Sequence, residues 1–135
     1  MADNVFVDAN IWLYAFMDDG EKKELACGIL AKKNCILSTQ VINEVCVNLI
    51  KKAGYEEEDI SLLVENLYRK YRIENVDKDI ILKASAIRTG NQVSYWDSLI
   101  IASAINSGCK ILYSEDLQHN QKIEGKLRII NPFKQ

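Results

Sequence analysis

The sequence has few of the residues that build the commonest catalytic and structural sites. Its single histidine, His119, lies in a polar loop, so we expect it to be solvated and not to act as a catalytic base. The cysteines are scattered and never form a Cys-x-x-Cys pair. We therefore interpret them as buried, reduced thiols of a cytoplasmic protein rather than as a zinc site or a disulfide framework. They are Cys27, Cys35, Cys46 and Cys109.

Long apolar runs and an excess of positive charge are also missing. No apolar run reaches the ~18–20 residues that a membrane span requires. Residues 1–4 do not open a basic segment followed by an apolar one, so we expect no signal peptide and no membrane contact. Because 19 acidic residues outnumber 17 basic ones, bulk charge alone cannot hold a nucleic acid. A local basic rim around an acidic centre is still compatible with this balance.

What the chain does contain is an alternation of short apolar runs and longer amphipathic segments. The runs predict strands at residues 5–7, 35–37, 73–76, 110–113 and 128–130, and the segments between them favour helices. Helices between successive strands imply right-handed crossovers and a mostly parallel sheet. We therefore predict one α/β domain spanning residues 1–135, with a central sheet of four to five short strands flanked by helices on both faces.

Local signals predict where individual helices begin, end and pack. Asn10 is expected to cap the first helix, and Gly54 to end the third. Residues 18–20 are expected to form a turn before the second helix, and Leu25 to lie on that helix's apolar, buried face.

Four acidic residues stand where such a sheet would bind a ligand. Asp8 and Asp116 follow predicted strands directly or closely, and Glu44 and Asp97 lie in the first half of helices that leave the sheet. In open α/β sheets, ligands bind beside the carboxyl ends of the strands. All four carboxylates can therefore point into one crevice along that edge.

Converging carboxylates favour a divalent cation. Without a counter-charge they repel one another and their pKa values rise. Mg²⁺ and Mn²⁺ prefer oxygen ligands, and the absence of histidine and cysteine from these positions argues against zinc. One ion could activate water, and a pair ~3.5–4 Å apart could stabilise both oxygens of an in-line phosphoryl displacement.

Each acid also has a purely structural interpretation. Asp8 could cap the turn that follows it, Asp116 could be a turn residue, and Glu44 could be an exposed helix charge. Asp97 fits a capping box with Ser94, in which its carboxylate would bond back to the start of the helix. Taken alone, each acid is best explained by a structural role. Because all four stand at the same predicted edge of the sheet, the set as a whole favours a binding site.

Four segments around these acids resemble the motifs of PIN-domain ribonucleases, and most closely those of small VapC-like toxins. The first is an apolar run ending in Asp-x-Asn, and the second a hydroxylated helix start followed by a glutamate. The third is an aspartate opening an alanine-containing helix, and the fourth a strand followed by Ser-x-Asp. These segments are residues 5–11, 38–44, 95–104 and 112–117. No single motif is specific, but the resemblance covers essentially the whole chain in order.

The resemblance implies a single PIN-like domain and assigns roles to the acidic residues and their neighbours. The metal-binding and catalytic carboxylates would be Asp8, Glu44, Asp97 and Asp116. Asn10 and Ser114 would orient them. Glu115 adds a fifth acid next to Asp116, so either of the two could face the metal, and the family pattern favours Asp116.

The resemblance also implies an activity and partners. The protein would be an endoribonuclease that uses one or two Mg²⁺ or Mn²⁺ ions and leaves a 5′-phosphate and a 3′-hydroxyl. It would form a homodimer, and a small antitoxin would cover its site. RNA would be held by lysines and arginines at the rim of the site. The candidates are Lys51, Lys52, Arg69, Lys70, Arg72 and Arg88.

Other classes fit the sequence less well. A haloacid-dehalogenase-type phosphatase needs Asp-x-Asp after its first strand, but Asn10 occupies the second acidic position. A receiver-type module needs adjacent acids near its N-terminus and a lysine after a late strand, which Ser114-Glu115-Asp116 does not supply. A third alternative is an inactive PIN-like scaffold that binds RNA or protein without cutting. Trp96 is expected to pack in the core, with base stacking as the alternative.

Overall fold

The computed structural model describes residues 3–17 and 20–134, and its centre is a six-stranded sheet in the order β3-β2-β1-β4-β6-β5. All neighbouring strands are parallel except β5 and β6, which form an antiparallel pair. The strands are β1 (Asn4–Val7), β2 (Asn34–Ser38), β3 (Arg72–Glu74), β4 (Ile111–Tyr113), β5 (Lys122–Ile123) and β6 (Leu127–Ile130). The central position of β1 follows from its continuous apolar sequence, which suits a strand buried on both faces.

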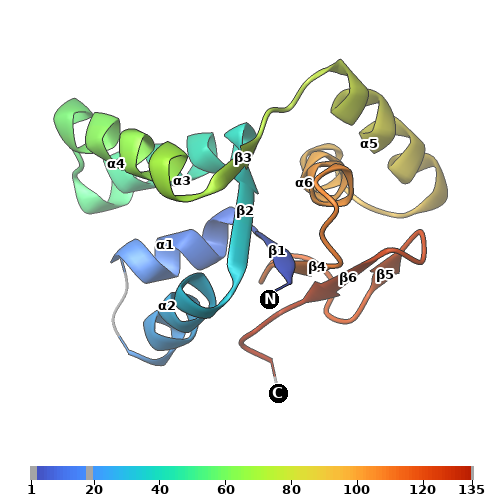
Figure 1. Cartoon of the computed structure of the whole chain (residues 1–135), viewed down its shortest axis with the longest axis horizontal. Coiled ribbons are helices and arrows are strands. Elements are labelled where there is room, and N and C mark those ends of the chain that lie inside the picture. The colour runs from blue at the N-terminus through green and yellow to red at the C-terminus, as the bar shows by residue number, and fades with distance from the viewer. Residues whose placement is uncertain (1–2, 18–19, 135) are drawn as a thin grey trace.

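Helices cover both faces of this sheet. Figure 1 shows α1 and α2 on one side of β2, and α5 and α6 on the other. The helices are α1 (Ala9–Met17), α2 (Glu21–Lys32), α3 (Thr39–Ala53), α4 (Glu57–Lys70), α5 (Lys78–Gly90) and α6 (Tyr95–Asn106). No described helix has the length and apolar character needed to cross a membrane. The predicted α/β architecture with a mostly parallel, doubly covered sheet is thus confirmed.

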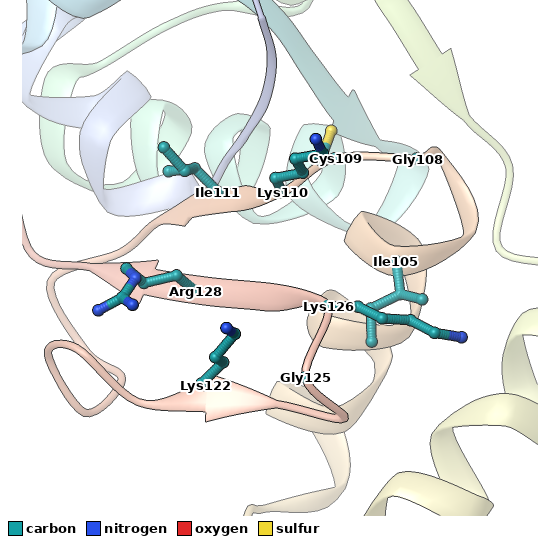
Figure 2. A pocket seen from close by; sticks show the side chains of 9 residues that line it. All are labelled: Ile105, Gly108, Cys109, Lys110, Ile111, Lys122, Gly125, Lys126 and Arg128. Carbon is teal, nitrogen blue, oxygen red and sulfur yellow. The ribbon is translucent and has the colours of Figure 1, made fainter.

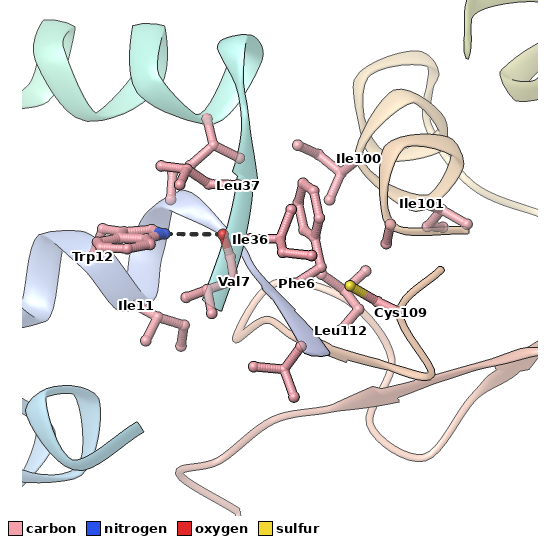
Figure 3. Packing of buried hydrophobic residues seen from close by; sticks show 14 of the residues in the cluster. Phe6, Val7, Ile11, Trp12, Ile36, Leu37, Ile100, Ile101, Cys109 and Leu112 are labelled. Atoms are coloured by element: carbon pink, nitrogen blue, oxygen red, sulfur yellow. Dashed lines mark hydrogen bonds between the residues drawn. The ribbon is translucent and has the colours of Figure 1, made fainter. Parts of the chain in front are cut away.

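The core is built around β1. Phe6 is fully buried and extends toward Ile100 and Ile101 of α6, while Trp12 lies on the other side of the strand (Figure 3). The Trp12 indole Nε1 donates a 3.0 Å hydrogen bond to the Val7 carbonyl, so its polar atom is satisfied inside the core. This packing fixes the end of β1, where the first candidate acid stands.

The helix ends agree with the sequence in some places and differ in others. Gly54 ends α3 with a φ of 69°, a left-handed conformation that glycine adopts readily. Asn10 does not cap α1, because the helix begins at Ala9 and Asn10 is its second residue. Leu25 is 48% exposed, so its predicted place on the apolar face of α2 is wrong, whereas Ile29 and Leu30 of the same predicted face pack partly buried against the core. Part of the turn predicted at residues 18–20 lies outside the described residues.

Three further expectations need correction. The sheet has six strands rather than four to five, because the two-residue strand β5 is too short to give an apolar run. The cysteines are free, but Cys27 is exposed and Cys46 only partly buried. His119 is not simply solvated, because its Nδ1 accepts a 2.9 Å hydrogen bond from the Asn131 amide and so holds the C-terminal segment.

Candidate active site

The parallel register of β1 and β4 brings Asp8 and Ser114 together. Val7 pairs with Tyr113, so the two strands end side by side, and the Asp8 amide donates to the Tyr113 carbonyl at 3.0 Å. The residue that follows β4 is Ser114, whose hydroxyl donates to Asp8 Oδ2 at 2.8 Å. Both residues are buried. The carboxyl edge of the sheet therefore begins with a carboxylate held by a neighbouring strand.

Asp8 also starts α1. Its Oδ1 accepts a 2.8 Å hydrogen bond from the Ala9 amide, and its carbonyl accepts a bond from Ile11. The capping role that we weighed for Asp8 is therefore present, and it occupies one carboxylate oxygen while Ser114 binds the other. With two hydrogen bonds and 6% exposure, the Asp8 carboxylate has a fixed orientation.

Asn10 joins Asp116 to the same network. The Asn10 Nδ2 group donates to Asp116 Oδ2 at 3.0 Å, and Asn10 Oδ1 accepts from the Glu115 amide at 3.2 Å. The Asp116 amide in turn donates to Ser114 Oγ at 3.2 Å. One asparagine and one serine thus hold the segment after β4 against the start of α1, as the motif resemblance implied.

Glu115 is engaged elsewhere. Its Oε1 accepts a 2.5 Å hydrogen bond from the Tyr14 hydroxyl, and its Oε2 lies 2.7 Å from Lys22 Nζ. Burial raises the pKa of Glu115, but the hydrogen bonds from Lys22 and Tyr14 outweigh it and leave the pKa below its usual value. Asp116, not Glu115, therefore belongs to the acidic cluster, which consists of Asp8, Glu44, Asp97 and Asp116.

Glu44 and Asp97 approach the cluster from α3 and α6. Gln40 links these helices, because its Nε2 donates both to Glu44 Oε1 and to the Trp96 carbonyl, each at 3.2 Å. The Ser94 hydroxyl accepts from the Asp97 amide at 3.1 Å, so Ser94 caps α6. Within residues 3–17 and 20–134, the Asp97 carboxylate receives no hydrogen bond, so only half of the predicted capping box forms and this carboxylate is available to a ligand.

The pKa shifts show that the four carboxyl groups influence one another. Burial raises the pKa of Asp8 to about 7; the hydrogen bonds from Ser114 and Ala9 oppose this shift, and the charges of Glu44 and Asp116 add to it. Partial burial also raises the pKa of Glu44, with Asp97 and Asp116 contributing. Like charges at close range cause such shifts. All four predicted acids are therefore brought to one edge of the sheet.

The donor set suits a hard cation, although it is not a closed cage. Among the described residues, no three acidic, histidine or cysteine side chains are arranged to enclose a metal ion. Mg²⁺ keeps several waters and is commonly held by only one or two carboxylates together with substrate phosphates, so an open group of oxygen donors is sufficient. A cation beside Asp8 would also offset the charge repulsion that contributes to its raised pKa.

The predicted basic residues fall into two groups. Arg72 is the first residue of β3, and its side chain donates to the Ser107 carbonyl at 3.2 Å, so Arg69, Lys70 and Arg72 lie toward the amino edge of the sheet, opposite the acidic cluster. Their position does not support the predicted contact with RNA at the site. Arg88, in contrast, donates to Ser98 Oγ at 2.8 Å in the first turns of α6.

Lys52, another of the basic residues predicted to hold RNA, lies near the acidic cluster. Lys52 lines a hollow of about 240 Å³ together with Asn10 and Tyr14, next to the acidic cluster. The prediction that Lys52 and Arg88 hold substrate is therefore compatible with their positions.

Another basic group lies away from the acidic cluster. A hollow of about 560 Å³ lies between α6 and the strands β4, β5 and β6. Figure 2 shows the side chains that line it. Its cations are Lys110, Lys122, Lys126 and Arg128, and none of them forms an ion pair within the described chain. No acidic side chain lines this hollow, so it cannot supply ligands to a metal ion.

Sequence reasoning missed three residues that support the site. Gln40 could have been found, because it precedes Glu44 by four residues and such pairs share a helix face. Tyr14 and Lys22 gave no local signal, since they contact Glu115 from 101 and 93 residues away along the chain. Trp96 was placed wrongly: it is 64% exposed rather than packed in the core.

The sheet order, the crossover helices and the acids at the carboxyl edge define an α/β domain with an acidic candidate site at that edge. The PIN domain family model matches residues 5–123. The chain therefore belongs to the PIN domain family. No curated protein is significantly similar to it in sequence.

Solved structures share this fold at low sequence identity. A toxin–antitoxin complex from Klebsiella pneumoniae aligns with a TM-score of 0.73 and 20% identity, covering 96% of this chain and 98% of that one. VapC20 from Mycobacterium tuberculosis, a Sarcin-Ricin loop cleaving toxin, has a TM-score of 0.67 and 19% identity over 83% of this chain and 91% of its own. VapBC2 from Rickettsia felis, bound to a promoter DNA fragment, aligns with a TM-score of 0.66 and 16% identity, covering 93% of this chain and 96% of that one.

Proposed function

We propose that this protein is an endoribonuclease that depends on Mg²⁺ or Mn²⁺ and acts as the toxin of a toxin–antitoxin pair. The observation that carries the proposal is the hydrogen-bonded network of Asp8, Ser114, Asn10 and Asp116, which faces the acids of α3 and α6. Family membership and the VapC fold of the solved relatives support the same class of activity.

Two kinds of carboxylate would hold the ion or ions. Asp8 and Asp116 are oriented by Ser114 and Asn10, whereas Glu44 and Asp97 reach in from helices. When bound, such an ion supplies a lower pKa for water and neutralises charge on the phosphate. The chain's own part is to hold these oxygens in place and to keep Glu115 out of the cluster through Lys22 and Tyr14.

The charge of the acidic cluster implies that cations bind before RNA. Because carboxylates repel phosphate, RNA would approach only after cations have offset the charges of Asp8, Glu44, Asp97 and Asp116. Lys52 and Arg88 would then hold the RNA backbone at the rim. The product ends would be a 5′-phosphate and a 3′-hydroxyl.

The partners are part of the proposal. Several solved relatives are toxin–antitoxin complexes, some with DNA, which supports a small antitoxin that covers the site of this protein. We propose that the protein is cytoplasmic and that it forms a homodimer, as the family resemblance implies.

Cleavage of RNA with and without Mn²⁺ tests the proposal. Wild type should cut only with the metal, and Asp8→Asn and Asp97→Asn should each abolish cutting. Asp79→Asn is a matched control, because Asp79 is an exposed acid in the first turn of α5. Equal cutting by all four proteins would show that the activity is a contaminant. Binding of RNA by wild type without any cutting would favour the inactive scaffold.

A further inference from the structure

Trp96 is the most exposed large apolar side chain among the described residues, and it directly precedes Asp97. Its exposed fraction is 64%, and that of its neighbour Tyr95 is 48%. Both stand in the first turn of α6, which carries one acid of the cluster. Burying an indole normally stabilises a fold, so an indole left in solvent at this position contributes little to stability.

The aromatic pair is braced by its neighbours. The rings of Tyr95 and Trp96 are 5.2 Å apart with an interplanar angle of 80°. The Arg88 guanidinium lies 4.5 Å from the centre of the Tyr95 ring and is itself bound to the buried Ser98 hydroxyl. The Trp96 carbonyl accepts a hydrogen bond from Gln40. Gln40 thus holds the backbone of Trp96 and Tyr95 contacts its ring, while much of the indole stays in solvent.

A hollow joins Trp96 to the acidic cluster. Its volume is about 490 Å³, within the range of small-ligand sites. Trp96, Val76 and Leu99 give it apolar walls. Glu44 is shared between this hollow and the cluster, and Asn43 and Thr39 add an amide and a hydroxyl.

We propose that Trp96 and this hollow bind an unstacked base of single-stranded RNA, next to the phosphodiester at the acidic cluster. This inference rests on the proposed endoribonuclease function. A nucleobase fits because an indole face stacks on any base, while an amide and a hydroxyl can hydrogen-bond to a base edge. Because Glu44 lines this hollow and also belongs to the cluster, a base held in the hollow would lie beside a phosphodiester at the cluster.

The proposal predicts a preference for unpaired RNA. In a duplex the bases stack on one another and are unavailable to an indole, so a loop or single strand should bind more tightly than a duplex of equal length. Loss of one base–aromatic stack typically weakens binding by roughly 5- to 150-fold.

Tryptophan fluorescence provides the test. Trp12 is 1% exposed and Trp96 is 64% exposed, so added RNA should quench only Trp96. The measurement uses a 20-nucleotide single-stranded RNA and the matching duplex, with Ca²⁺ in place of Mg²⁺ or Mn²⁺ so that a cation offsets the acidic cluster while cleavage is prevented. Because the Trp96 variants lack this fluorophore, their affinity is measured by the fluorescence anisotropy of a labelled RNA. Trp96→Ala should weaken single-strand binding by roughly 10-fold or more, and Trp96→Phe should recover part of that affinity. Tyr68→Ala, which removes a 50% exposed aromatic on α4, is the control and should bind like wild type.

The outcomes separate this inference from the proposed function. If wild type cuts RNA with Mn²⁺ and Trp96→Ala binds and cuts equally well, the base subsite is refuted and the nuclease stands. If wild type cuts no RNA but Trp96→Ala still loses binding, the subsite stands and the nuclease is refuted. If Trp96→Ala alters only the molecular mass in solution, the aromatic pair is a contact between protein copies and the inference is overturned.

Discussion

Asp8→Asn should stabilise the metal-free protein at alkaline pH while abolishing cleavage. The Asp8 carboxyl group is buried between two strand ends, and its pKa is raised from 3.8 to about 7. An asparagine can replace it with little rearrangement, because its oxygen can still accept from Ala9 and its amide can donate to Ser114 Oγ. The substitution therefore removes a buried charge and keeps the shape of the site.

The magnitude follows from the difference in pKa between the folded and unfolded chains. Below pH 3.8 Asp8 is protonated in both the folded and the unfolded chain, so its ionisation does not affect the free energy of unfolding. Between pH 3.8 and about 7 the unfolded chain releases this proton while the folded chain keeps it, so the free energy of unfolding falls with rising pH. At about 1.4 kcal/mol per unit, the loss reaches roughly 4 kcal/mol above pH 7.

Urea unfolding at pH 5 and pH 8 in EDTA measures this effect, with fluorescence as the readout. The stability of Asp8→Asn relative to wild type should rise by about 2–3 kcal/mol between these pH values, because most of the titration of Asp8 falls in this interval. Comparing the two proteins at each pH removes the contribution of Glu44 to first order. Asp79→Asn should show no such change. A relative stability that is the same at both pH values would refute the claim that Asp8 is held in an unfavourable charged state.

Three further predictions test the site and the core. Mg²⁺ or Mn²⁺ at pH 8 should raise the Tm of wild type but not of Asp8→Asn, measured by thermal unfolding, because only the folded site binds the ion. Glu115→Gln should cut RNA nearly as well as wild type while Asp116→Asn should not, and the reverse result would exchange their roles. Phe6→Ala should lower the free energy of unfolding by about 3–5 kcal/mol in urea titrations, since it leaves a cavity between β1 and α6.

The fold and the four acids could be predicted because both depend on strong local patterns. Residues 5–7 form an unbroken apolar run, which is the pattern of a parallel strand covered on both faces. Once the strands are parallel, acids that follow them must share an edge. The same rule should have excluded Arg72 from the site, because Arg72 begins a strand whereas Asp8 follows the end of one.

Other features depend on contacts between distant parts of the chain. Nothing local distinguishes Glu115 from Asp116, and the distinction comes from Tyr14 and Lys22, which lie about a hundred residues earlier. Trp96 could not be placed either, because residues 94–107 are largely apolar around the whole helix and do not indicate which side faces solvent.

The carboxylates of the site differ in how firmly the protein holds them. Both carboxylate oxygens of Asp8 accept hydrogen bonds from the protein, so the orientation of this side chain is fixed. Because Asp8 is buried at the end of the central strand, its charged form is disfavoured and its pKa is raised. Asp97 has a capped backbone and a carboxylate that is free within the described chain. Under the proposed function, Asp8 fixes where the ion sits and Asp97 completes its ligands after binding. Replacing Asp8 while keeping Asp97 would then remove the group that positions the ion. Replacing Asp97 while keeping Asp8 would leave weak binding of the ion but no cleavage of RNA.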